Sequence, residues 1–167
     1  MLGRIARAQE LVNRYATYLG SLPLLATRVT VGLGFFVTGR GKLSHLDGII
    51  DFFRSLNIPF PEYQAPFVAR LEYYGGILLM LGLFCRPTAA LLIGTMVVAI
   101  YTSDWGDLVK AWDTNSETFP PVTVTAYTYL LMLGFLACYG AGVFSLDRLG
   151  SWLLKRSSGT QSPSPQE

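Results

Sequence analysis

The chain has 167 residues, of which 51% are hydrophobic and 14% are charged, and its formal net charge is +2. This composition is too apolar for an ordinary soluble domain and indicates one integral membrane unit. So small a net charge, scattered along the chain, excludes a nucleic-acid-binding surface. We therefore expect the lipid bilayer, and no nucleic acid, as the partner of this chain.

Residues 1–21 are expected to form an amphipathic cytoplasmic segment. Within residues 4–16, apolar side chains repeat at helical spacing opposite Arg4, Arg7 and Arg14. This pattern is typical of a short helix on the membrane surface, and a solvated helix would show the same pattern. A cleaved export signal is not expected, because the apolar run that follows is too long.

Four apolar stretches predict four transmembrane helices, and therefore an all-α integral membrane four-helix bundle. The expected helices cover residues 22–43, 66–85, 87–103 and 122–144. Pro87 and Pro121 fit the first turns of the third and fourth helices, because proline needs no amide partner there. The folded domain would cover residues 22–146, and residues 147–167 would be a disordered cytoplasmic tail.

The two outer loops have different patterns. Residues 44–57 carry apolar side chains at helical spacing and predict a short interfacial helix that ends before Pro59. The second loop, residues 104–121, is expected to place Trp105 and Trp112 at the lipid headgroups and to have a mobile polar end. Seven basic residues lie on the side of the termini and five on the other side, which favours cytoplasmic termini.

Cysteine and histidine offer little chemistry. On the expected topology Cys85 and Cys138 both lie towards the reducing side of the membrane, so we expect small packing residues rather than a disulfide. The single histidine, His45, stands in no recognised metal-ligand spacing, and no nucleotide-binding motif is present. No metal or nucleotide cofactor is therefore expected.

Charges inside the apolar stretches carry the strongest signal. Arg28 and Lys42 are 14 residues apart, which returns to within about 40° of one helix face. Glu72 lies in the outer half of the second expected helix and matches Lys42 or Arg40 in depth, and we prefer Lys42 because it shares a face with Arg28. We therefore predict a Lys42–Glu72 pair, with Arg28 held by helix-end carbonyls or tyrosine hydroxyls, because an unpaired intramembrane charge is costly.

Arg40 and Arg70 are also charged residues within or beside these stretches. Both fit the simpler role of anchoring helix ends at the headgroups, where a long cationic side chain reaches water.

Several ordered motifs follow Arg28 in the sequence: "GRGKL", "FFRSLNIPFPE", "LEYYGGILLMLGLFCRPTAALL" and "GAGVFSLDRL". Together they resemble the DoxX family of small bacterial membrane proteins over about residues 26–149. The resemblance implies a four-helix bundle in the bacterial cytoplasmic (inner) membrane, related to the DoxD-type subunit of thiosulfate:quinone oxidoreductase. Some members are linked to membrane oxidoreductase complexes and resistance to oxidative stress. The family's polar motif falls on Arg28, Gly41, Lys42, Pro59, Pro61, Glu72, Gly75, Gly76 and Asp147.

Two functions remain open. In the first, the chain is the membrane subunit of a quinone-linked oxidoreductase: Arg28 and Lys42 donate hydrogen bonds to the quinone, Glu72 carries protons, and Tyr73 or Tyr74 orients the ring. Its electrons would come from a partner subunit. In the second, the chain is a non-catalytic scaffold or small-solute carrier whose charged cluster fixes helix register, and a carrier would require a homo-oligomer.

Overall fold

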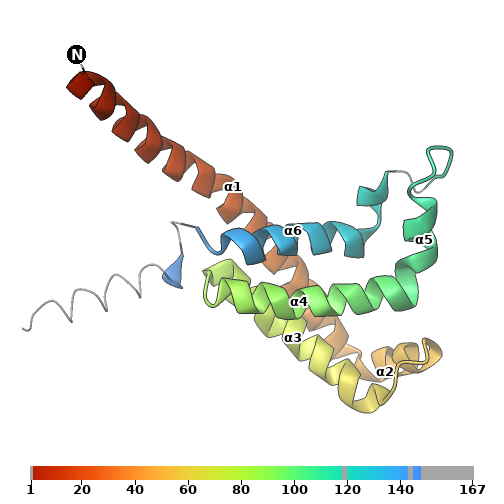
Figure 1. Cartoon of the computed structure of the whole chain (residues 1–167). Coiled ribbons are helices and arrows are strands. Elements are labelled where there is room, and N and C mark those ends of the chain that lie inside the picture. The colour runs from red at the N-terminus through yellow and green to blue at the C-terminus, as the bar shows by residue number, and fades with distance from the viewer. Residues whose placement is uncertain (1, 118–119, 143–144, 148–167) are drawn as a thin grey trace, which may run out of the picture.

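The computed structural model describes residues 2–117, 120–142 and 145–147, with side chains from residue 20 onwards. The described part of the chain forms helices joined by turns and loops and contains no strand, as expected (Figure 1). Its long helices are α1 (Leu2–Ser44), α3 (Pro61–Leu81), α4 (Cys85–Ala99) and α6 (Thr125–Tyr139). Its short elements are α2 (Leu46–Ser55), the π-helix η1 (Ile100–Asp104), α5 (Trp105–Lys110) and the 3₁₀ helix η2 (Pro121–Thr123).

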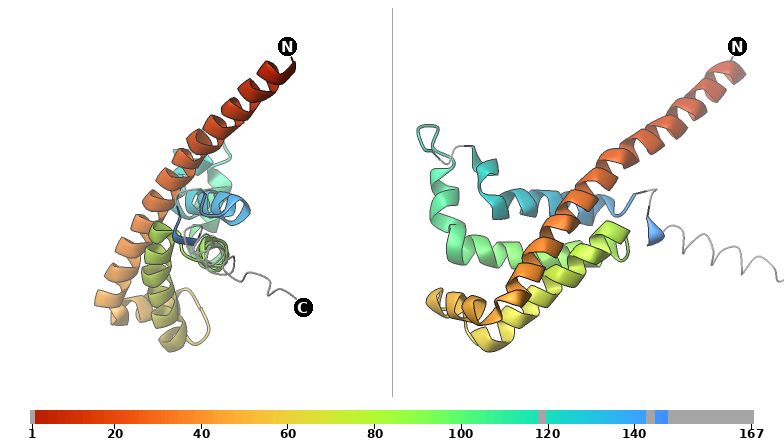
Figure 2. Two further views of the ribbon diagram at one scale, coloured as in Figure 1. Left: turned by 90° about the vertical axis from the view of Figure 1, so that its left-hand side faces the viewer. Right: turned by 180° about the vertical axis from the view of Figure 1, so that it is seen from behind.

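Helix α1 is longer than the sequence predicts. It runs unbroken through Pro23, so the separate surface helix expected at residues 4–16 is the first part of α1. A proline inside a helix removes one backbone hydrogen bond, and here it does not end the helix. The N-terminal part of α1 extends away from the other helices (Figures 1 and 2).

Helices α1 and α3 lie side by side in opposite directions (Figure 2). Glycines bring their backbones into contact: a Cβ built on Gly76 would lie 2.5 Å from the carbonyl oxygen of Gly32 and from the amide nitrogen of Phe36. A Cβ on Gly39 would meet the backbone of Tyr73. Because small residues permit such close approach, this contact sets the register of α1 against α3.

Helices α4 and α6 form a second antiparallel pair, which crosses the first pair obliquely (Figures 1 and 2). The two pairs meet in an apolar core that includes Val31, Phe35, Leu79, Leu92 and Leu133. In this core the ring of Phe35 lies 5.1 Å from that of Tyr129, centroid to centroid. The four expected long helices are thus present as two pairs that cross obliquely (Figures 1 and 2).

The turn between α3 and α4 is held from the far end of the chain. Gly82 ends α3 with a φ of +68°, a conformation that glycine adopts without strain. Asp147 binds this turn on both sides: the Phe84 amide donates to Asp147 Oδ1 at 3.1 Å, and the Asp147 amide donates to the Gly82 carbonyl at 3.3 Å. Asp147, expected as the first tail residue, therefore belongs to the fold, and residues 148–167 lie outside the described chain.

The remaining helix ends differ from the sequence expectation. Helix α3 begins at Pro61 rather than residue 66, because proline starts a helix at its first turn. The chain stays helical through η1 and α5 to Lys110, so the expected outer loop begins later. The expected helix at 44–57 is confirmed as α2.

The polarity of the surface is inverted relative to a soluble protein. Arg28 and Glu72 are buried, whereas large apolar side chains such as Leu33, Val97 and Leu131 are about half exposed. Two helical stretches, Gly20–Ser44 and Cys85–Lys110, are long and apolar enough to cross a membrane by length and composition. Helix α6 is apolar and shorter.

The α1–α3 contact predicts unequal effects for one substitution at two helical glycines. Gly76→Ala should lower the free energy of unfolding by about 2 kcal/mol, because backbone atoms cannot move aside for the new methyl group. Gly134→Ala is the matched control, since no atom lies within 4 Å of a Cβ there. Thermal unfolding of the two purified variants measures the difference, and equal midpoints would contradict the contact.

Candidate functional site

The predicted pair of Lys42 and Glu72 is in contact. Lys42 Nζ lies 2.6 Å from Glu72 Oε1, and the two side chains are 29% and 2% exposed. The Thr38 hydroxyl lies 3.4 Å from the other carboxylate oxygen of Glu72. Each oxygen of this buried carboxylate therefore has a polar neighbour, as a charge removed from water requires.

Backbone packing positions this pair. Gly39 packs on the backbone of Tyr73, the residue that follows Glu72. Thr38 precedes Gly39, and Lys42 lies one turn beyond Thr38 on α1. Residues four apart share a helix face, so both side chains reach the same carboxylate on α3.

The pair lies on the wall of a cavity of about 460 Å³ between α2, α3, α4 and η1. Most of the lining is apolar, with Phe52 and Phe53 from α2 and Met96 and Val98 from α4. Thr95, Thr102, Ser103 and Gln64 add a few polar groups. A mostly apolar cavity with few polar groups is the usual form of a small-molecule site.

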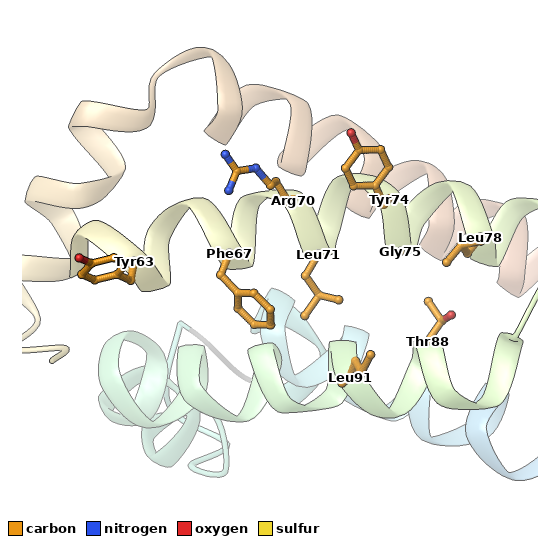
Figure 3. A pocket seen from close by; sticks show the side chains of 9 residues that line it. All are labelled: Tyr63, Phe67, Arg70, Leu71, Tyr74, Gly75, Leu78, Thr88 and Leu91. Carbon is orange, nitrogen blue, oxygen red and sulfur yellow. The ribbon is translucent and has the colours of Figure 1, made fainter. Parts of the chain in front are cut away.

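A second, shallower groove of about 340 Å³ runs along the other side of α3 and α4 (Figure 3). Arg70, Tyr63 and Tyr74 belong to its α3 side, and Thr88 lines it from α4. We call it the outer groove, and the space beside Lys42 and Glu72 the inner cavity.

Arg28 lies inside α1, 14 residues before Lys42. Fourteen residues of helix separate the two cations by about 21 Å, so Arg28 does not belong to the inner cavity. The Arg28 guanidinium is 2% exposed and donates to the Ala141 carbonyl at 2.6 Å, just beyond the end of α6. The prediction that helix-end carbonyls hold Arg28 is therefore confirmed.

The two tyrosines expected beside the ligand face elsewhere. The ring of Tyr73 packs against Phe36 and against Tyr74, each at 5.1 Å between centroids. Tyr74 is 59% exposed and lines the outer groove. Neither side chain lines the inner cavity, so their predicted role in orienting a ring there lacks support.

Several residues that line the inner cavity or contact Glu72 were absent from the sequence prediction. Thr38 carried a usable signal, because it stands four residues before Lys42 on the same face. Gln64 and Ser103 carried none, since each was assigned to a loop or a helix end. Arg40 and Arg70 are both exposed, which suits their expected role as anchors.

The cysteines divide between two environments. Cys85 is buried in the core, in agreement with a packing role, and Cys138 is exposed. The packing role expected for Cys138 is therefore wrong, because its side chain faces outwards from α6. The sulfur atoms form no disulfide in the described part of the chain.

A surface ion-pair cluster ties α2 to the start of α3. Arg54 lies 2.6 Å from Asp51 Oδ1 within α2 and 2.8 Å from Glu62 Oε1 on α3. A hydrogen bond from its own backbone N–H and another from Arg54 hold the pKa of the Glu62 carboxyl below its usual value. These contacts position α2, which forms one wall of the inner cavity.

Removing one ion of the buried pair should destabilise the protein. Glu72→Gln leaves the Lys42 ammonium without its counter-charge, which we expect to cost about 2–3 kcal/mol, the lower range because Lys42 is partly exposed. Adding Lys42→Met should recover part of that loss. Chemical unfolding of the single and double variants gives the coupling as a double-mutant cycle. A coupling energy near zero would show that Lys42 and Glu72 do not stabilise the protein as a pair.

The Arg54–Glu62 contact should depend on pH in one direction. Because the folded pKa of Glu62 lies below the unfolded value, the contact stabilises the fold above the unfolded pKa and is lost as the pH falls through the folded pKa. Spin labels at Gly48 and Tyr63 should therefore report α2 moving away from α3 in acid. In Arg54→Gln the distance should no longer respond to this titration, and an unchanged response would exclude this contact as its cause.

The DoxX family model matches residues 23–105. Three curated relatives match most of the chain. "Inner membrane protein YphA" of Escherichia coli (strain K12) is 31% identical over 144 residues, 81% of this chain and 96% of the relative. "Putative oxidoreductase CatD" of Bacillus subtilis (strain 168) is 37% identical over 125 residues, 74% and 83% of the two chains.

The third relative, "Inner membrane protein YqjF" of Escherichia coli (strain K12), is 28% identical over 133 residues, 78% of this chain and 94% of the relative. No solved structure matches the chain significantly. With a relative above 30% identity that is covered almost completely, and with the family model matching α1 to η1, the chain belongs to the DoxX family.

Proposed function

We propose that this chain is a multi-pass protein of the bacterial cytoplasmic membrane, crossed by α1, α3, α4 and α6, with both termini in the cytoplasm. The inverted polarity supports this, because buried charges beneath exposed apolar side chains suit a hydrocarbon solvent. Two candidate spanning helices and two relatives named inner membrane proteins add support. The excess of basic residues on one side supports the orientation.

Within that membrane, we propose that the chain binds a quinone as the membrane subunit of an oxidoreductase complex. The observation that carries this proposal is the Lys42–Glu72 pair on the wall of an otherwise apolar cavity. The printed name of one relative, "Putative oxidoreductase CatD", favours a redox role over an inert scaffold. Electrons would come from a partner subunit of the dehydrogenase class.

The residues of the inner cavity fit a quinone. A bound quinone supplies two-electron, two-proton chemistry inside the bilayer. Lys42 would donate a hydrogen bond to a carbonyl oxygen and pass it a proton as the partner subunit supplies the electrons. The Glu72 carboxylate would then take up a proton from water and pass it to the neutral Lys42 amine, which restores the ion pair. Because Glu72 already neutralises Lys42, the pair favours a neutral carbonyl compound over an anion. The apolar walls exclude water and accept the ring.

The role of each polar side chain differs from the expectation that included Arg28 and the tyrosines. Lys42 and Glu72 form the reactive end of the inner cavity, and Thr38 holds the second oxygen of Glu72 in place. Arg28 has a structural role, since it ties α1 to the segment just after α6.

Filling the inner cavity without touching the ion pair tests the binding proposal. Gly94 lines this cavity, and no atom lies within 4 Å of a Cβ there. Gly94→Leu should therefore weaken binding of a decyl-tailed benzoquinone at least about tenfold without lowering thermal stability. Gly134→Leu, at an equally open position outside the cavity, should bind like the wild type.

Two results would contradict the proposal. The quinone site is excluded if the wild-type protein does not bind the benzoquinone, or if Gly94→Leu binds it with the affinity of the wild type. The oxidoreductase complex falls if the chain purifies from native membranes in mild detergent with no dehydrogenase. In that case the charged pair serves to fix helix register in a scaffold.

A further inference from the structure

The inner cavity and the outer groove are separated by a thin wall. Phe67, Leu71 and Leu91 line both spaces. Figure 3 shows Phe67 and Leu71 reaching from α3, and Leu91 from α4, into the gap between the two helices. At this point, therefore, side chains alone separate the inner cavity from the outer groove, and no backbone segment lies between the two spaces.

This wall is weakly held on its outer side. Phe67 and Leu91 are 61% and 56% exposed, so more than half of each side chain contacts no other part of the described chain. Exposed side chains change rotamer quickly and at low cost. Leu71, the third wall residue, packs against the core, so a passage between α3 and α4 would open beside Phe67 and Leu91.

The outer groove continues along the helices beyond the wall. Gly75 and Leu78 line it from α3, and Thr88 lines it from α4. Gly75 has no side chain to obstruct it, and a Cβ built there would already lie 3.3 Å from Leu92. The result is a mostly apolar channel whose length follows the helix axes.

We propose that the inner cavity takes the ring of a long-tailed quinone, which enters sideways from the bilayer between α3 and α4 and leaves its tail in the outer groove. This inference rests on the proposed function and specifies its substrate class: a membrane-dissolved quinone with a long apolar tail, rather than a small soluble one. A cavity of about 460 Å³ suits a drug-sized molecule, so a long tail has to leave it.

The continuity of the two spaces favours this tail over a bilayer phospholipid as the occupant of the outer groove. The tail is attached to a headgroup that the inner cavity binds, so both spaces are filled by one molecule. A phospholipid has an anionic phosphate, which the neutralised Lys42–Glu72 pair does not favour. Arg70, at the edge of the outer groove, is the cation that would bind a phospholipid instead.

The test fills the outer groove while leaving the inner cavity unchanged. Leu78 lines only the outer groove, so Leu78→Trp should weaken binding of an isoprenoid-tailed benzoquinone about tenfold and of the tail-less ring less than about twofold. Leu81→Trp is the matched control: it lies on the same helix, is 46% exposed and lines neither space. This variant should change neither affinity.

A photoreactive group at the end of the tail gives a second measurement on the wild-type protein. Irradiation should label the α3 or α4 peptides that carry Leu78 and Thr88. Labelling of α2 would overturn the proposal, because the tail would then leave past Phe52 and Phe53. The proposal would also be overturned if Leu78→Trp lowered the affinity for both compounds equally, or lowered the affinity for neither.

Failure of this inference can be told from failure of the proposed function. If Lys42→Met abolishes binding of both compounds and Leu78→Trp changes the affinity for neither, the quinone site is supported and the proposed path of the tail is excluded. If the wild type binds neither compound, the proposed function itself falls. If Leu78→Trp alters only the phospholipid that co-purifies with the protein, the outer groove belongs to the lipid.

Discussion

The direct backbone contact between α1 and α3 is the constraint on which the rest of the structure depends. Where Gly32 meets Gly76 and Gly39 meets Tyr73, no side chain separates the two helices. Dispersion attraction is short-ranged, so this close approach is both a source of stability and a fixed register. Moving α3 by one residue would rotate Glu72 away from Lys42 and leave two charges buried apart.

The same register separates two polar regions along α1. Lys42 and Glu72 lie beside α2, and Arg28 lies beside the end of α6, with the apolar core between them. Under the proposed orientation the ion pair belongs to the outer side of the membrane. A proton taken up by Glu72 would then exchange with that side alone, while Arg28 holds the cytoplasmic ends of the helices together.

Helical periodicity predicted which face of α1 carries Arg28 and Lys42, but it did not predict which residues surround each side of α3. The depth of Glu72 and the stripe through Arg28 and Lys42 were sufficient to pair the right residues, because charges in apolar surroundings have few possible partners. Tyr73 and Tyr74 could not be assigned in the same way. Which side of α3 faces a cavity depends on where α4 crosses it, and that crossing follows from packing between residues far apart in the sequence.

Composition also did not predict where the helices begin and end. Pro23 suggests a break that α1 does not have, and residues 104–110 are polar enough to resemble a loop although they continue a helix. The amphipathic pattern of α2 was clear, yet its function as a cavity wall required the position of α3. Local patterns therefore predicted the elements, whereas the inner cavity depends on how α1, α2, α3, α4 and η1 pack together.

The π-helix η1 has a consequence for how this protein can change during evolution. A π turn contains one more residue than an α turn, so it is usually the trace of a single insertion in a helix. Here it brings Thr102 and Ser103 to the inner cavity and precedes the change of direction into α5 (Figure 1). Deleting one residue here would let a regular helix form without turning α5 by the roughly 100° that a deletion inside an α-helix causes, because the wide turn already absorbs the extra residue. A one-residue deletion in η1 would therefore change which side chains reach the inner cavity and leave the direction of α5 unchanged.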